Sequence, residues 1–171
     1  EIEQITALTV NQEAKIAGNG TVIHGNVTVA SENVTLKGLT IKGDLIVKGN
    51  IQGEVKVDST AIEGKVVTEE VDQTAFYSRK TVAATNFVPM ATMNMTRLTI
   101  TFNDSTVAVV EIKNSDSSVN FSGATVVSLI EVKSNGSIIA DADVILPSVK
   151  ISEGVANVVL NASIANVSIE S

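Results

Sequence analysis

Four short segments in the N-terminal third decide the fold: GNVTV (residues 25–29), ENVTLKGLTI (32–41), GDLIV (43–47) and GEVKV (53–57). Within them apolar and polar residues alternate, which is typical of strands that bury one face. Glycine, asparagine and aspartate separate the segments, and these residue types favour turns. The stretch therefore predicts short β-strands joined by tight corners.

Apolar residues then recur about every 20 residues along the whole chain. One column runs through Val27, Ile46, Val67, Val88, Val109, Leu129, Val149 and Val167. A second runs through Val34, Val55, Phe76, Leu98, Val119, Ile138 and Val158. A third, less regular column runs through Ile41, Ile62, Val82, Phe102, Val126, Ile145 and Ile164. Three short strands in each repeat of this length indicate a solenoid whose coils have three faces.

The repeat predicts an all-β fold, a single-stranded right-handed parallel β-helix of about eight coils with three short strands each. Val and Ile make up 43 of the 171 residues, which suits ladders of inward-pointing aliphatic side chains. We expect one domain over residues 1–171, in which residues 1–18 form an N-terminal cap or a truncated coil. A β-sandwich or a leucine-rich repeat fits less well, because neither combines this period with so little leucine.

Residues 68–97 differ in composition from the rest of the chain. They contain all three methionines, the single tyrosine and both arginines. Because Phe76, Val82 and Val88 keep the spacing, we predict one irregular coil with enlarged loops. This coil is either loosely packed around Met and Phe or a lateral recognition loop. Tyrosine and arginine are common interface anchors, so the candidate binding residues are Tyr77, Arg79 and Arg97.

The segments quoted above resemble the right-handed β-helical regions of secreted surface proteins. Such regions occur in S-layer-like and adhesin-like proteins of Gram-positive bacteria, within the pectate-lyase-like superfamily. The resemblance covers residues 25–67 and, more loosely, residues 107–169. It implies a secreted or cell-surface location in bacteria and a scaffold role. The superfamily also contains polysaccharide lyases and hydrolases, so the resemblance leaves the activity open.

Two glutamates are the best-spaced acids for such an enzyme. Glu111 and Glu131 are 20 residues apart, so the repeat places them on adjacent coils. Lys113 and Lys133 follow at the same offset, which instead favours a Glu/Lys ladder on a solvated face. We therefore predict no catalytic residue.

Other ionisable residues give weaker indications of a site. Asp141 and Asp143 alternate along one segment, where they suit a polar corner or, with more oxygen ligands, Ca²⁺. His24 is the single histidine and has no positioned serine or cysteine partner, so we expect a corner or surface position. The sequence thus predicts no metal site and no cofactor.

Composition excludes several classes of function. The chain carries 19 acidic and 12 basic residues, which argues against nucleic acid as a partner. It has no apolar run long enough to span a membrane, and it has no cysteine for disulfides or thiol catalysis.

The expected function is a non-enzymatic structural or adhesive module of a secreted bacterial surface protein. Its partner would be a cell-wall or host glycan or another surface protein, and open coil ends favour self-association. The alternatives are a polysaccharide lyase or hydrolase of the β-helix superfamily and a phage tail-fibre-type β-helix.

Overall fold

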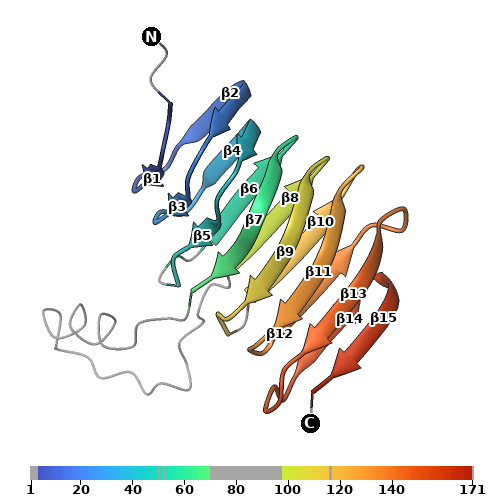
Figure 1. The fold of residues 1–171 in the computed structure, drawn as a ribbon. Coiled ribbons are helices and arrows are strands. Elements are labelled where there is room, and N and C mark those ends of the chain that lie inside the picture. The colour runs from blue at the N-terminus through green and yellow to red at the C-terminus, as the bar shows by residue number, and fades with distance from the viewer. Residues whose placement is uncertain (1–3, 50, 52, 70–97, 116, 171) are drawn as a thin grey trace, which may run out of the picture.

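The computed structural model describes residues 4–170 except 50, 52, 70–97 and 116, and the described part is all-β (Figure 1). The strands are β1 Leu8–Val10, β2 Lys15–Ile23, β3 Val27–Val29, β4 Val34–Ile41, β5 Leu45–Val47, β6 Gly53–Asp58, β7 Ala61–Thr68, β8 Leu98–Asn103, β9 Thr106–Ile112, β10 Ser117–Ser122, β11 Val126–Val132, β12 Gly136–Ala140, β13 Ile145–Ile151, β14 Val158–Asn161 and β15 Ser163–Ile169.

The strands pair in parallel and stack as the coils of a β-solenoid, as predicted. The first face of the stack contains the first parts of β2 and β4, followed by β6, β8, β10, β12 and β14. The third face contains β1, β3 and β5 and then the last parts of β7, β9, β11, β13 and β15. A short second face joins them within each coil. The described residues form about seven coils, close to the eight expected.

Aliphatic side chains form continuous buried columns inside the stack. The column on the first face is fully buried and paired in register, and it consists of Val34, Val55, Ile100, Val119 and Ile138. On the third face they are Val27, Leu45, Val66, Val110, Ile130 and Val149. Phe102 and Phe121 stack between adjacent coils with ring centroids 5.4 Å apart. Short, β-branched side chains fill this narrow core well.

The predicted columns are displaced at several positions. On the third face the outward, half-buried residues are Ile46, Val67, Val109 and Leu129, each beside the true inward residue. On the second face Val126 and Ile145 are exposed, whereas Val127 and Leu146 are buried. Phe102 lies on the first face, and Leu98 pairs with Gly53 and not with Val55. Where two apolar residues are adjacent, alternation alone cannot tell which of them faces inward.

The strands on either side of residues 70–97 pair directly with each other. β6 pairs with β8, and β7 pairs with β9, so the inward columns continue from Val55 to Ile100 and from Val66 to Val110. The strands that these columns were expected to separate are therefore direct neighbours, and Phe76, Val82 and Val88 lie outside the described residues. The irregular coil predicted over residues 68–97 lies outside the described residues beyond Glu69, as do the candidate binding residues Tyr77, Arg79 and Arg97.

From this direct pairing we predict that the stack forms without the intervening sequence. We expect that replacing residues 70–97 with a link as short as Lys133–Asn135, which joins β11 to β12, leaves the melting temperature nearly unchanged. Circular dichroism of the shortened and full-length chains checks this. A large fall in melting temperature would mean that the coils on either side need residues 70–97 for their pairing.

The described part of the predicted N-terminal cap contributes strands to the stack. β1 pairs with β3 on the third face, and the start of β2 pairs with β4 on the first. Ile5 forms an isolated parallel bridge with Ile23 on the second face. Residues 5–10 thus form a partial coil at this end.

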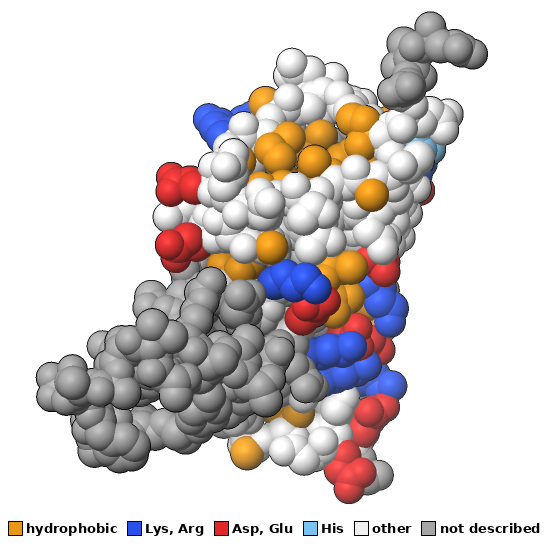
Figure 2. Space-filling view, turned by 90° about the vertical axis from the view of Figure 1, so that its left-hand side faces the viewer, with side chains coloured by type: hydrophobic (Ala, Val, Ile, Leu, Met, Phe, Trp, Pro, Cys, Tyr) orange, Lys and Arg blue, Asp and Glu red, His pale blue; other side chains and the backbone are white. Residues whose placement is uncertain are grey.

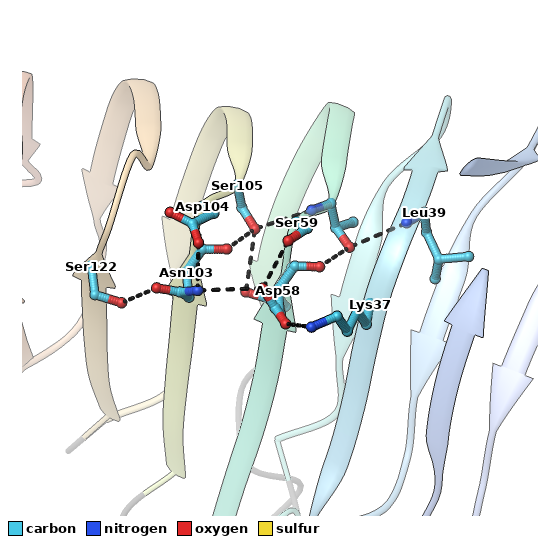
Figure 3. Close-up of polar contacts among 10 residues, drawn as sticks. Lys37, Leu39, Asp58, Ser59, Asn103, Asp104, Ser105 and Ser122 are labelled. Atoms are coloured by element: carbon cyan, nitrogen blue, oxygen red, sulfur yellow. Dashed lines mark hydrogen bonds and ion pairs between the residues drawn. The ribbon is translucent and has the colours of Figure 1, made fainter. Parts of the chain in front are cut away.

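The corner between the first and second faces contains stacked residues with positive φ. Gly38, Ser59, Asp104 and Gly123 have φ values of 63°, 48°, 47° and 62° and follow directly after paired positions of successive coils. Figure 3 shows the polar contacts that run along this corner. Lys37 pairs with Asp58 at 2.6 Å, and Asn103 donates to the same carboxylate at 3.3 Å.

Inside the same corner, buried hydroxyls link the coils. Thr60 Oγ1 accepts from the backbone N–H of Leu39, and Ser105 Oγ accepts from that of Thr60 (Figure 3). Thr125 Oγ1 accepts in turn from the backbone N–H of Ser105. Each hydroxyl also donates to a carbonyl of its own coil, so these buried polar groups are satisfied.

The corner between the second and third faces depends on glycine. Gly25, Gly43 and Gly64 are stacked there, and a Cβ on Gly64 would lie 2.4 Å from the carbonyl oxygen of Gly43. Asn26 Oδ1 accepts from the N–H of Asp44, and Asp44 Oδ1 accepts from that of Lys65, both at 2.8 Å. Side-chain oxygens thus replace backbone partners where the chain turns.

Candidate functional site

Charged side chains concentrate on the outer surface of the third face. Glu111 on β9 and Glu131 on β11 are direct partners in the parallel register, which confirms the predicted stacking. Lys113 and Lys133 follow them on the same face. Figure 2 shows basic and acidic side chains next to one another on one side of the molecule. We call Lys65, Glu111, Lys113, Glu131 and Lys133 the third-face ion cluster.

Glu111 is the centre of this cluster and is only 5% exposed. Its carboxylate accepts a hydrogen bond from Lys133 Nζ and lies 3.6 Å from Lys113 Nζ. Burial acts to raise the pKa of this carboxyl group. The hydrogen bond from Lys133 and the charges of Lys113, Lys133 and Lys65 outweigh burial, so the pKa of Glu111 lies below its ordinary value.

Further ion pairs extend the pattern along the third face. Lys65 Nζ lies 3.8 Å from Glu131, Lys48 lies 2.8 Å from Glu69, and Lys150 pairs with Glu170. The Glu/Lys ladder predicted from the sequence is therefore present, although Glu111 is buried and not solvated. The sequence reasoning missed Lys65. Its register partner is Val109, two residues before Glu111, so a correct register would have placed it in the cluster.

The cluster leaves little capacity for acid–base catalysis. A general acid needs a proton at working pH, but the lowered pKa of Glu111 keeps it ionised. Both glutamates already have lysine partners. A shallow hollow of about 360 Å³ lies beside the cluster, lined by Asp44, Ile46, Val67, Glu69 and Lys113. Its openness to solvent gives none of the water exclusion that an active site uses.

The other candidate residues lie apart from the cluster. Asp141 and Asp143 are exposed at a turn, where the Val144 N–H donates to the carbonyl of Asp141 at 3.0 Å. The side chain of His24 is exposed, and its backbone N–H donates to the carbonyl of Ile5. Among the described residues no group of three or more His, Asp or Glu side chains could hold a metal ion.

The lowered pKa of Glu111 predicts a pH dependence of stability. Because this carboxyl is more acidic in the folded chain, its ion pairs stabilise the fold above the ordinary pKa of 4.5. That stability is lost as pH falls through the lower, folded-state pKa. We expect the melting temperature of the native chain to decrease as the pH is lowered below 4.5. The melting temperature of Glu111→Gln should decrease less steeply over the same pH range.

A matched control is the exposed pair formed by Glu63 and Lys42. Glu63→Gln should leave the pH profile of the melting temperature close to that of the native chain, since exposed pairs contribute little. Equal profiles for Glu111→Gln and the native chain would show that the buried carboxylate does not govern acid stability.

Comparisons with known proteins give no family for the chain. No family model, no curated protein and no solved structure matches it. Within the part of the chain that the structure describes, no helix is long and apolar enough to cross a membrane.

Proposed function

We propose that this chain is a non-enzymatic structural or adhesive module of a secreted bacterial cell-surface protein. The observation that carries the proposal is the state of the two best-spaced carboxylates. Glu111 is buried and pairs with Lys113 and Lys133, and Glu131 pairs with Lys65. The acids that would serve a lyase or hydrolase are therefore engaged in ion pairs, two of which link different coils.

The stack has properties that suit a scaffold. Seven coils at a spacing of ~4.8 Å give a rod about 30–35 Å long. Hydrogen bonds and ion pairs connect each coil to the next, and no buried side-chain nitrogen or oxygen of the described residues lacks a hydrogen-bond partner. A rod of this kind holds a fixed distance between whatever lies at its two ends.

The first face offers a polar surface for adhesion. Its outward residues include hydroxyl, amide and lysine side chains in register, namely Thr35, Lys56, Thr101 and Asn120. Side chains of these types suit a glycan or a polar protein surface as partner. Secretion and the surface location rest on the resemblance to surface β-helices.

Incubation with pectin, alginate and hyaluronan tests the proposal. We expect neither new ultraviolet absorbance from unsaturated products nor new reducing ends, with the native chain and with Glu131→Gln alike. Turnover by the native chain that Glu131→Gln abolishes would overturn the scaffold role in favour of a polysaccharide lyase or hydrolase.

Co-sedimentation with purified bacterial cell walls tests the adhesive role. The residues predicted to bind, Tyr77, Arg79 and Arg97, lie outside the described residues and stay candidates. A triple alanine variant should bind walls less while keeping the native melting temperature. Equal binding by both proteins would remove these three residues from the proposal.

A further inference from the structure

The dipeptide Asn-Gly, which loses ammonia from its asparagine more readily than other dipeptides, occurs at Asn19-Gly20 and at Asn135-Gly136. In this reaction the backbone nitrogen of the glycine attacks the side-chain amide carbon of the asparagine. Glycine favours the attack because it has no side chain to obstruct the approach and because its backbone rotates freely. Since the two sites share the same dipeptide, their surroundings in the fold decide which of them reacts.

Asn19 and Gly20 lie in a bulge of β2. The register of β2 with β4 is interrupted after Ala17 and resumes at Thr21, so neither residue of the dipeptide has a partner in the ladder. Both residues are exposed, and both have positive φ, 47° and 89°. Nothing lies within 4 Å of the position that a Cβ on Gly20 would occupy. The peptide unit between the two residues therefore has room to rotate, and rotation brings the Gly20 nitrogen to the amide carbon.

The exposure of Asn19 is a property of the corner between the first and second faces. Asn19 lies at this corner beside Gly38, because a Cβ on Gly38 would be 3.4 Å from the Asn19 nitrogen. Ser59 and Asp104 occupy the same corner in coils inside the stack, and they also have positive φ and are exposed. Asn19 is thus accessible because of its corner position and not because of the coil to which it belongs.

The second Asn-Gly is held by the neighbouring coil. Asn135 Oδ1 accepts hydrogen bonds from the backbone N–H groups of Ala156 at 3.1 Å and Asn157 at 2.9 Å. The N–H of Gly136 donates to the carbonyl of Asn157 at 3.2 Å, and Gly136 is paired on both sides in the first-face ladder. The attacking nitrogen and the amide are therefore both fixed, and they can meet only after these hydrogen bonds open.

We propose that Asn19 is a site of spontaneous deamidation and that Asn135 is protected from the same reaction. The Gly20 nitrogen forms a bond to Cγ of Asn19, and the bond from Cγ to Nδ2 breaks. Ammonia leaves with the proton of the Gly20 N–H, and a cyclic succinimide remains. Water then opens the ring at either carbonyl, which leaves aspartate or isoaspartate at position 19. Water is the sole co-reactant.

The fold accommodates both products of the reaction. Asp104 has a φ of 47° at the same corner, so aspartate fits this backbone conformation. Isoaspartate lengthens the backbone by one carbon, and in the bulge no ladder pairing is lost through this. We therefore expect Asn19→Asp to keep the native melting temperature. Each event adds a negative charge to a chain whose formal net charge is −7, so the product separates from the native chain by ion exchange.

Peptide mapping by mass spectrometry, after incubation of the folded full chain in mildly alkaline buffer, tests this proposal. We expect Asn19 to deamidate roughly tenfold or more faster than Asn135, because the hydrogen bonds that hold Asn135 and Gly136 must first break. Incubation in concentrated urea is the matched control, and there both asparagines should react at similar rates. Gly20→Ala should slow the reaction at Asn19 and leave the rate at Asn135 unchanged.

The remaining outcomes contradict the proposal. Equal rates in the folded chain, or a faster reaction at Asn135, overturn it. A difference between the two asparagines that persists in urea assigns the selectivity to local sequence and overturns the role of the fold. The ratio of products tests the succinimide without any variant, because the ring yields isoaspartate as well as aspartate. Aspartate alone at position 19 indicates direct hydrolysis of the amide and overturns the attack by the Gly20 nitrogen.

Discussion

Replacing Ile130 with aspartate is expected to unfold the coil stack, whereas the same change at the adjacent Leu129 is expected to be tolerated. Ile130 is fully buried in the third-face column between Val110 and Val149. An aspartate there has no partner and costs on the order of 4 kcal/mol or more. Leu129 points outward and is half-buried, so the carboxylate introduced by Leu129→Asp stays hydrated.

Urea denaturation of the two variants measures the difference. Ile130→Asp should lack a cooperative transition or show one at much lower urea concentration than the native chain. Leu129→Asp should keep the native slope with a modest change in midpoint. The reverse order of stability would mean that the register of the third face is shifted by one residue.

Replacing Gly43 with alanine should cause the second large loss of stability. A Cβ at this position would lie 2.3 Å from Asn26 Oδ1 and 2.6 Å from the carbonyl carbon of Gly25. The backbone of Gly25 cannot move without breaking the corner, because the N–H of Gly43 donates to its carbonyl. We expect a destabilisation of about 3 kcal/mol.

Gly154→Ala separates this steric effect from the general cost of replacing glycine. Gly154 has nothing within 4 Å of the added Cβ, and its φ of +81° is its sole constraint. Its variant should lose about 1 kcal/mol through backbone strain. Thermal unfolding of both variants compares the two costs. Similar losses would show that the close approach at Gly43 relaxes freely.

The period of the coil could be predicted from the sequence, but the register could not be predicted throughout. At Val34, Val55 and Val119 a polar residue follows the apolar one, so alternation identified the inward side chain correctly. At Val109-Val110 and Leu129-Ile130 both neighbours are apolar, and hydrophobicity carries no information about direction. The choice there depends on β-bulges and corner geometry, which are tertiary properties.

The candidate site was predictable to a similar extent. The 20-residue spacing of Glu111 and Glu131 placed them side by side, and the lysines two residues later predicted their pairing. The burial of Glu111 is a tertiary property that no local pattern encodes, and one of its two lysine partners, Lys133, comes from the next coil. In the sequence Thr60 likewise has the character of an ordinary loop residue. Its hydrogen bond to the preceding coil is seen only in the structure.

The direct pairing of β6 with β8 has a consequence for folding. Val34 and Val55 are 21 residues apart in the chain, whereas the paired residues Val55 and Ile100 are 45 apart. The longer closure adds only about 0.7 kcal/mol of chain entropy, since this cost grows with the logarithm of length. The coils before and after this junction can therefore nucleate separately and join afterwards. An insertion at the junction is expected to reduce the free energy of unfolding only slightly.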